Sequence, residues 1–407
     1  MEVASVPRRS LFGTFADVPP RVRSLILLMF PSLTGLGYFI IVISGYLPEL
    51  GISATYVGLI LGVFSVATIL SSIPLGIMAD RRGKKRIILV ALSGIPFMFL
   101  VYGLTTDVAA ILVISVFGGI IEAGFLTGWN ALIADMTTLE QRNSAFSLSF
   151  VVNNISFGIG CVIPFLFPAI EDLSGLSVRT LHSATFLFFA AVSTISPIMI
   201  MRLLKDLKET TRERQSIRKT ESLGLVLKFS VIAGVFGFGA GLIIPLIPTL
   251  LFLEFAVPDT YSGPLLAIAS VMMALSAVAS TRLAKRYGPV NTIVLTQASS
   301  TVFMLALAFS PNAFTLGGLY LIRTALMNMA APVQDSYLMS VISEKDRGVA
   351  SAITGITWRL PNSVTTVIGG IMLAHGMFDT PFFIATAIYI AGIVLFYHFF
   401  RNVAPKK

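Results

Sequence analysis

Charged residues are scarce in this sequence. Asp, Glu, Lys and Arg make up 12% of its 407 residues and 55% of the residues are hydrophobic, whereas a soluble globular chain carries about 25% charged residues. A helix that crosses a bilayer needs about 20 mostly apolar residues, and runs of that length follow one another along most of the chain. The composition therefore predicts an all-α integral membrane protein.

Cysteine and histidine are also rare, and familiar catalytic motifs are missing. The single cysteine, Cys161, makes an intrachain disulfide impossible. His182 and His375 lie near the ends of apolar runs, as interfacial residues do, and His398 is isolated from both. The phosphate loop G-x-x-x-x-G-K-[ST] and the motifs H-E-x-x-H and G-x-S-x-G are absent. The sequence thus predicts no metal and no cofactor, and an intramembrane enzyme or a sensor is only a distant alternative to transport.

The apolar runs predict twelve transmembrane helices. The predicted spans are 24–46, 55–78, 86–104, 108–133, 142–167, 180–201, 223–250, 257–283, 290–309, 313–341, 348–374 and 380–400. If the segment 79–85 is cytoplasmic, the loops on that side hold most of the Lys and Arg residues, and the opposite loops hold acidic residues and only Arg179. This positive-inside pattern predicts a plasma-membrane protein with both termini cytoplasmic. We expect the protein to be a monomer. Its net charge of +9 then orients the helices in the lipid bilayer rather than binding nucleic acid.

The chain contains an internal repeat. The segment "EQRNSAFS" resembles "EKDRGVASA", and setting Arg142 on Arg347 gives an offset of 205 residues. The same offset sets Gly83 on Gly288. Two landmarks with one offset predict two six-helix bundles, and in transporters such parallel repeats hold the substrate between them near the bilayer midplane. The predicted bundles are residues 1–201 and 223–407, and the predicted cytoplasmic linker is 202–222.

The basic segment between the second and third predicted spans carries a family resemblance. It reads "PLGIMADRRGKKRII", and "GIMADRRGKK" within it resembles the cytoplasmic-loop signature of the major facilitator superfamily. The residues that match the signature are Gly76, Asp80, Arg81, Gly83, Lys84 and Lys85. The resemblance implies a twelve-helix transporter of two pseudo-symmetric bundles, in which this loop is a conformational latch together with Arg142 and Arg347. Within it, we expect Gly76 to let two helix backbones approach closely.

Four charged side chains stand out within the predicted spans. A charge at mid-bilayer costs at least about 2.5–3.5 kcal/mol, so each needs a partner or a function. The repeat offset relates Asp335 to Asn130 and Arg359 to Asn154. We expect Asp335 to face Arg359, and Asn130 to face Asn154, as a structural polar clasp between two helices in each half.

The other two charges, Glu122 and Arg323, lie on related faces of two helices. Glu122 and Trp129 share a face of the fourth predicted span, and Arg323, Met327 and Gln334 share a face of the tenth. In the superfamily these two helices help to line the central cavity, so the resemblance implies that the stripes face each other across the substrate path. Glu122 is then the candidate proton-binding group. Arg323 keeps its charge and either attracts an anionic group or neutralises Glu122; in the alternative, neighbouring helices satisfy both.

These residues favour secondary transport of a small molecule. A lone acidic residue in an apolar, aromatic, Met-bearing cavity favours a proton-coupled exporter of amphipathic compounds that works by alternating access. Two buried arginines favour the alternative, proton-coupled uptake of a small organic anion or metabolite. The sequence differs from drug/proton antiporters of the superfamily at two places: Val116 stands near the position of their helix-4 arginine, and "GIGCVIP" contains only part of their helix-5 Gly-Pro signature.

Overall fold

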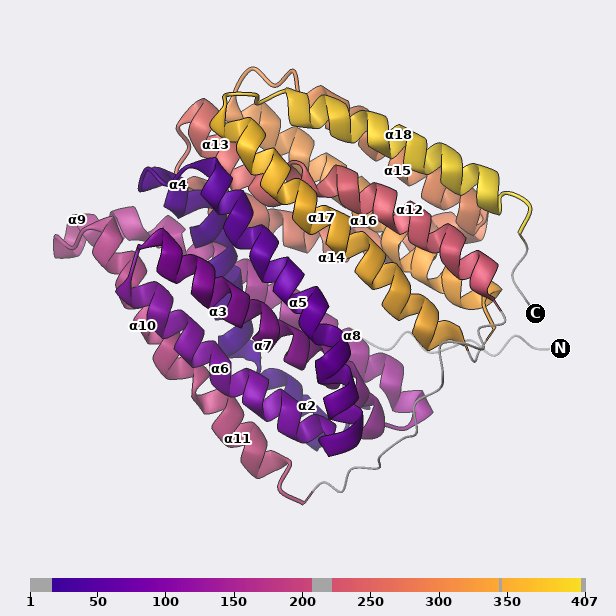
Figure 1. Cartoon of the computed structure of the whole chain (residues 1–407), viewed down its shortest axis with the longest axis horizontal. Helices are drawn as coiled ribbons and strands as arrows, with labels where there is room; N and C mark the ends of the chain where they lie inside the picture. The colour runs from indigo at the N-terminus through magenta and orange to yellow at the C-terminus, as the bar shows by residue number, and fades with distance from the viewer. Residues whose placement is uncertain (1–16, 207–221, 344–345, 404–407) are drawn as a thin grey trace.

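The computed structural model describes residues 17–206, 222–343 and 346–403, and these residues form helices and connecting turns with no strand. The side chains of a few residues within helices, Asp80 and Arg347 among them, are outside this description. Figure 1 shows the helices gathered in two groups, the indigo-to-magenta half of the chain and the salmon-to-yellow half. The fold is therefore the predicted one, with twelve transmembrane helices in two six-helix bundles.

The first bundle contains the first six spans, three of which are interrupted. The first span consists of α2 (Pro20–Leu27), α3 (Phe30–Ile41), the π-helical turn η1 (Val42–Tyr46) and α4 (Leu47–Glu49). The next three are α5 (Ala54–Arg82), α6 (Lys84–Leu104) and α7 (Val108–Asp135). The fifth consists of α8 (Leu139–Val162), the 3₁₀ turn η2 (Ile163–Leu166) and α9 (Phe167–Ser174), and the sixth of α10 (Val178–Ser193) and α11 (Ile195–Leu203).

The second bundle begins with another interrupted span. This seventh span consists of α12 (Leu223–Gly241), the 3₁₀ turn η4 (Ile244–Leu246) and α13 (Ile247–Phe255). The remaining spans are α14 (Asp259–Tyr287), α15 (Pro289–Leu307), α16 (Ala313–Val341), α17 (Arg347–Ala374) and α18 (Thr380–Phe400). Most of the predicted linker, residues 207–221, lies outside the described residues.

Two spans of the second bundle, α16 and α17, carry charged residues well inside the helix. Within the part of the chain that the structure describes, nine helical stretches are long and apolar enough to cross a membrane on composition alone, and α16 and α17 are not among them. The charged residues are Arg323 and Asp335 in α16 and Arg359 in α17. Both helices contribute to the cavity described below, which is a physical reason for their charged residues.

The internal repeat is visible in where the helices begin. Ala54 opens α5 and Asp259 opens α14, 205 positions later, and both helices are 29 residues long. The helices α7 and α16 begin with the same spacing. Gly83 (φ 95°) and Gly288 (φ 79°) connect each long helix to the next one, in a backbone region that glycine adopts without steric cost. The predicted offset therefore relates whole helices and not only short motifs.

Related helices also have related N-caps, which leads to a first prediction. The carboxylate of Asp107 accepts the N–H of Ala110 at 2.9 Å, and the amide oxygen of Asn312 accepts the N–H of Thr315 at 2.9 Å. Replacing such a cap with alanine costs about 1 kcal/mol. We therefore expect Asp107→Ala to lower the thermal unfolding temperature of the detergent-purified protein, whereas Asp107→Asn preserves it; equal effects of the two changes would contradict the capping role.

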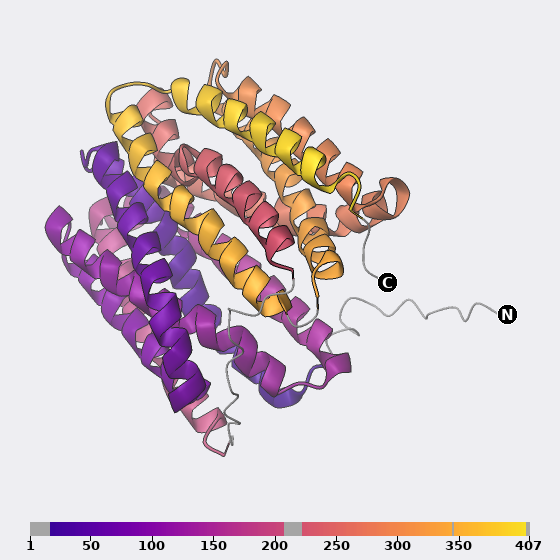
Figure 2. The same ribbon diagram turned by 45° about the vertical axis from the view of Figure 1, so that its right-hand side comes forward.

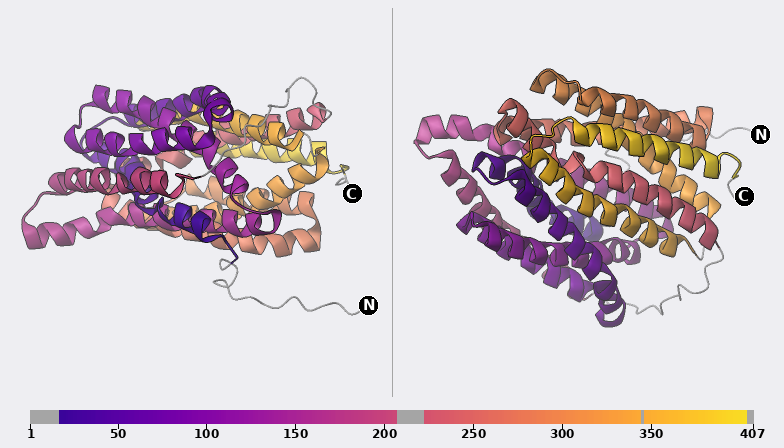
Figure 3. Two further views of the ribbon diagram at one scale, coloured as in Figure 1. Left: turned by 90° about the horizontal axis from the view of Figure 1, so that it is seen from below. Right: turned by 45° about the horizontal axis from the view of Figure 1, so that its top comes forward.

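The two bundles contact each other closely at one end, which we call the closed end. Helix α5 packs on α17, and α8 packs on α14. A Cβ atom on Gly58 would lie 2.6 Å from the carbonyl oxygen of Thr366, and one on Gly263 would lie 2.1 Å from that of Cys161. Figures 1 and 2 show α5 and α17 side by side at this end and spreading apart toward the other, and the same divergence is visible on the right of Figure 3.

One hydrogen bond at the closed end joins two positions that the repeat makes equivalent. The hydroxyl of Thr249, in α13, donates to the backbone carbonyl of Ser44, in η1, at 2.6 Å, and the two residues are 205 positions apart. The hydroxyl of Ser44 instead donates to the carbonyl of Ile40 in its own helix, at 2.7 Å. The interrupted parts of the first and seventh spans are therefore in contact. Thr249 donates a hydrogen bond to Ser44, but Ser44 does not donate one to Thr249.

Candidate functional site

A cavity of about 850 Å³ lies between the bundles. Helices of the second bundle supply most of its wall, and the first bundle contributes Ile40, Ser44 and Phe157. Its size is that of a pocket for a drug-sized ligand. The apolar part of the wall includes aromatic and methionine side chains, and its charged groups are Arg323, Asp335 and Arg359.

Arg323 is a buried cation in this wall. Its side chain belongs to α16 and the residue is 3% exposed. Its Nη2 donates to the hydroxyl of Tyr389 at 2.7 Å, and its guanidinium carbon lies 5.4 Å from the centre of that ring. Its Nε has no hydrogen-bond partner, and no ion pair to a carboxylate is found for it among the described residues. The positive charge is therefore only partly satisfied by the protein.

Two polar neighbours of Arg323 in the cavity wall are also unsatisfied. The side-chain oxygen of Gln297, from α15, and the hydroxyl of Thr324, next to Arg323 on α16, are buried without a hydrogen-bond partner. Buried polar atoms are normally paired. This side of the cavity thus offers a bound molecule a charged donor together with two neutral polar groups.

Glu122 forms an ion pair that crosses from one bundle to the other. Its Oε1, on α7, lies 3.7 Å from Nη1 of Arg359, on α17, and the two side chains are 31% and 39% exposed. Its other oxygen accepts the hydroxyl of Thr68, on α5, at 3.2 Å. The sequence led us to expect Asp335 to face Arg359, and a pair of Glu122 with Arg323 was one of the alternatives for those two residues. The structure differs because the repeat offset relates positions within the two halves, whereas this contact depends on which helices meet between them.

The predicted polar clasp is absent from the described side chains. Asp335 is exposed in the cavity wall, and the carboxylate partner of Arg359 is Glu122. Asn154 donates to the carbonyl of Phe150 in its own helix at 2.8 Å, and Asn130 is exposed. The prediction of two facing pairs is therefore wrong in this conformation.

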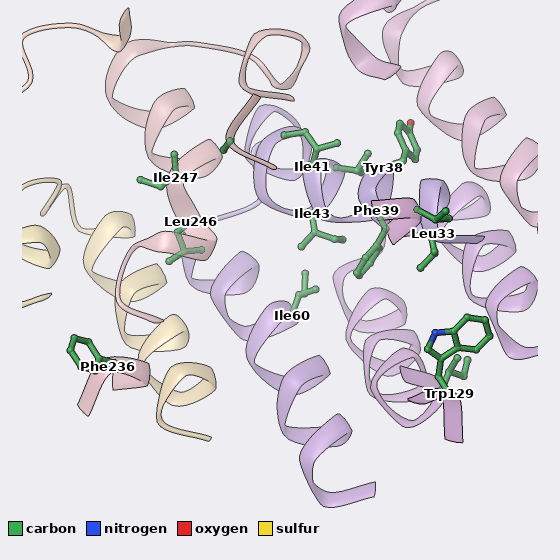
Figure 4. Packing of buried hydrophobic residues seen from close by; sticks show 14 of the residues in the cluster. Leu33, Tyr38, Phe39, Ile41, Ile43, Ile60, Trp129, Phe236, Leu246 and Ile247 are labelled. Atoms are coloured by element: carbon green, nitrogen blue, oxygen red, sulfur yellow. The ribbon is translucent and has the colours of Figure 1, made fainter. Parts of the chain in front are cut away.

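Trp129 contributes to packing rather than to the cavity wall. Its Nε1 donates to the hydroxyl of Ser149, on the next helix, at 3.0 Å, and its ring centre lies 4.9 Å from that of Phe125. Figure 4 shows Trp129 within the first bundle, well away from Phe236 of the cavity wall. Of the remaining predicted pathway residues, Met327 and Gln334 do line the cavity, but a role for them in transport stays a prediction.

Comparison with known proteins identifies the family. The model of the Major Facilitator Superfamily matches residues 25–233 and again residues 229–407. The chain belongs to this superfamily. Relatives include the quinolone resistance protein NorA of Staphylococcus aureus (strain COL), 22% identical over 89% of this chain and 92% of its own, and multidrug resistance protein 1 of Bacillus subtilis (strain 168), 24% identical over 90% and 93%. It is a multi-pass membrane transporter of small molecules and not an enzyme.

Solved structures of transporters share the fold. A bacterial homolog of the human lysosomal transporter Spinster, in an inward-facing and occupied conformation, matches with a TM-score of 0.73 at 14% identity, covering 94% of this chain and 96% of that one. The nucleoside transporter NupG matches with a TM-score of 0.68 at 16% identity, covering 94% and 100%. At such identities the likeness concerns the fold of the superfamily and not the substrate.

The loop that carries the superfamily signature makes its side-chain contacts to other residues of the first bundle. The ammonium group of Lys84 pairs with the carboxylate of Asp135 at the end of α7, and that of Lys85 donates to the carbonyl of Leu204. Arg142 donates to the carbonyl of Ala134 at 3.1 Å. Arg81 is exposed. The side chains of Asp80 and Arg347 are outside the description, so the latch role of this loop stays a prediction.

The prediction for Gly76 is not supported. A Cβ atom there would meet only a methyl group of Thr127, at 3.9 Å, which is an ordinary van der Waals contact. Other glycines, such as Gly58 and Gly263, are the ones at which helix backbones approach closely.

Sequence reasoning missed a polar cluster at the closed end. His182, expected at the membrane interface, is instead 2% exposed and lies against Asp259 of the other bundle, which is fully buried. The available signals were weak: an isolated histidine early in an apolar helix, and an acidic residue directly after Pro258 at a helix start. Neither indicates that the two residues meet.

Proposed function

We propose that this chain is a proton-coupled exporter of amphipathic compounds that works, as a monomer, by alternating access. The observation that carries the proposal is the ion pair between Glu122 and Arg359, because it joins the two bundles beside the cavity. A proton on Glu122 removes the negative charge and weakens the pair. Proton binding then favours separation of α7 from α17, which couples the proton to the movement of the halves.

The distribution of charge supports an orientation. The basic loop that contains Lys84 and Lys85 joins the ends of α5 and α6 that are remote from the closed end. By the positive-inside rule, this end faces the cytoplasm. The cavity would then open to the cytoplasm and the closed end would face outward. In the same orientation, the start of α2 and the end of α18 would lie on the cytoplasmic side, which supports cytoplasmic termini.

The chemistry of the cavity supports an amphipathic substrate. Phe157, Phe236, Met327 and Trp358 provide apolar and aromatic surface, and Arg323 provides a buried charge at one side. A pocket that combines a broad apolar wall with a few polar groups binds ligands of mixed character. The names of two relatives, a quinolone resistance protein and a multidrug resistance protein, point in the same direction.

A second candidate function is uptake of a small organic anion or metabolite together with protons. The specific observation in its favour is Arg323, whose charge has no carboxylate partner among the described residues. An anionic group of a substrate would complete its hydrogen bonding. Under this alternative the same residues bind substrate, but the direction of transport is reversed.

The deciding experiment is transport by purified protein in proteoliposomes under an imposed pH gradient. The probes are a fluorescent quinolone for export and a radiolabelled aromatic carboxylate for uptake. We expect the wild type to export the quinolone in exchange for protons that move down their gradient. Glu122→Gln should lose the gradient-dependent part of this flux, because the amide cannot bind and release a proton.

Glu171→Gln is the matched control, since it makes the same chemical change on α9, outside the cavity wall. It should transport as the wild type does. Quinolone flux that ignores the pH gradient would overturn the exporter proposal, and gradient-driven accumulation of the carboxylate would establish the second candidate. An unaffected Glu122→Gln would remove Glu122 from coupling.

A further inference from the structure

The buried cluster at the closed end belongs to neither the cavity nor the Glu122 pair. Asp259, the first residue of α14, is its member from the second bundle. The first bundle surrounds Asp259 with His182 from α10, Glu49 from α4 and two tyrosines, Tyr38 and Tyr46, from the first span. The cluster is thus assembled across the contact between the two halves.

The carboxylate of Asp259 is in an unusual position. The residue is 0% exposed, and neither of its side-chain oxygens has a hydrogen-bond partner. Its Oδ2 lies 3.4 Å from Nε2 of His182, which is itself buried without a hydrogen bond. The backbone N–H of Asp259 donates to Oε1 of Glu49, so Glu49 caps the N-terminus of α14 from the opposite bundle, where a negative charge is favourable.

The histidine ring is held firmly in place. Its Nδ1 lies 2.7 Å from the hydroxyl of Tyr38, and its ring stacks on that of Tyr46 with 3.6 Å between centroids. These contacts orient Nε2 toward the aspartate. The remaining charge near the cluster, Arg179, is exposed at the start of α10 and donates to the hydroxyl of Thr106 at 3.2 Å. Within the described residues, no guanidinium or ammonium group therefore pairs with Asp259.

An ionised carboxylate without hydrogen bonds is very costly to bury. The capping role of Glu49 favours its negative charge, which further disfavours a second one on Asp259. A single proton, held by Asp259 or shared with Nε2 of His182, relieves both costs. If the halves separate at this end, Asp259 moves away from His182 and becomes hydrated. Its carboxyl group can then ionise without the cost of burial, and the proton is released.

We propose that Glu49, His182 and Asp259 form a second proton-binding site, which exists only while the closed end is shut. Closure then takes up one proton, and acidification favours closure. This linkage between closure and proton binding follows from the contact between the halves alone. That the proton comes from outside the cell rests on the proposed function. For an exporter, the site ties closing of the outer gate to proton capture on the side where protons are supplied.

The test measures the closed end directly, without transport. Spin labels are placed at Leu173→Cys, beside the end of α9, and Phe314→Cys, at the start of α16, which are 90% and 91% exposed and lie on opposite bundles. The background carries Cys161→Ser. Double electron–electron resonance in lipid nanodiscs then gives the closed fraction between pH 8 and pH 5. We expect the ratio of closed to open protein to rise as pH falls, by up to about tenfold per pH unit for one linked proton.

Glu122→Gln is expected to retain a pH response, and in that background the contribution of the Glu122–Arg359 pair is removed. Adding Asp259→Asn is then expected to abolish the remaining response, because the amide keeps the shape and cannot titrate. Asp259→Ser replaces the amide variant if the latter does not fold. In the Glu122→Gln background, a pH response that survives either Asp259 change overturns the proposal, as does a response that Glu122→Gln alone removes. Failure of the transport assay would leave these distances, and the proposal they test, unaffected.

Discussion

Oxidation of cysteines introduced by Gly62→Cys and Val367→Cys is expected to stop transport completely. Gly62 is on α5 and Val367 on α17, at the closed end. A Cβ atom on Gly62 would lie 2.7 Å from Cγ2 of Val367, so two cysteines there can reach the Cβ–Cβ separation of a disulfide, about 3.5–4.5 Å. The cross-link would join the two bundles. Under the proposed alternating-access mechanism, a carrier must open at both ends in turn and cannot work with one end cross-linked.

The measurement compares efflux from proteoliposomes before oxidation, after oxidation and after reduction, in a background that carries Cys161→Ser. Serine can retain the donation that Cys161 makes to the carbonyl of Gly37. The matched control is Gly94→Cys with Ile121→Cys. A Cβ atom on Gly94 would lie 2.8 Å from Cγ1 of Ile121, but both residues belong to the first bundle. Transport that continues at full rate through the oxidised 62–367 pair would show that the closed end does not open during the cycle.

The second large effect is expected from Gly263→Ala. A Cβ atom there would lie 2.1 Å from the carbonyl oxygen of Cys161, which is backbone and cannot rotate away. Overpacking of this kind costs about 1–3 kcal/mol, and the strain is present only while α8 and α14 are in contact. The equilibrium should therefore shift toward opening of the closed end, by roughly 5- to 150-fold at about 1.4 kcal/mol per factor of ten.

The distance between labels at positions 173 and 314 reports this shift. Gly158→Ala is the control, because a Cβ atom there points into the same contact but would meet its nearest neighbour, Ala267, at 3.8 Å. That variant should keep the closed fraction of the wild type. If Gly263→Ala leaves the distance distribution unchanged, the close contact of α8 with α14 does not hold the closed end shut.

Helix positions could be predicted from the sequence because an apolar run is a local property of the chain. The repeat could be predicted for a similar reason: the same offset that relates Gly83 to Gly288 relates the first residues of whole helices. Likewise, the rarity of charge within spans was enough to draw attention to Arg323 and Glu122, both of which lie at or beside the cavity.

The pairing of these charges could not be predicted in the same way. Arg359 meets Glu122 because α17 lies beside the first bundle, and no periodicity within a single helix contains that information. The burial of His182 against Asp259 has the same origin. Even Trp129, which shares a helical face with Glu122, is directed by a hydroxyl of the following helix rather than by the cavity. What the sequence pattern lacks in each case is the contact between helices.

The bond from Thr249 to Ser44 makes opening at that end unequal for the two halves. When the bundles separate, the hydroxyl of Thr249 loses its acceptor and must find another, whereas the hydroxyl of Ser44 keeps its bond to Ile40. The energetic cost of parting thus falls on one copy of a duplicated unit. Two segments that the repeat makes equivalent thus act as a donor and an acceptor, and a molecule with an internal repeat need not move symmetrically.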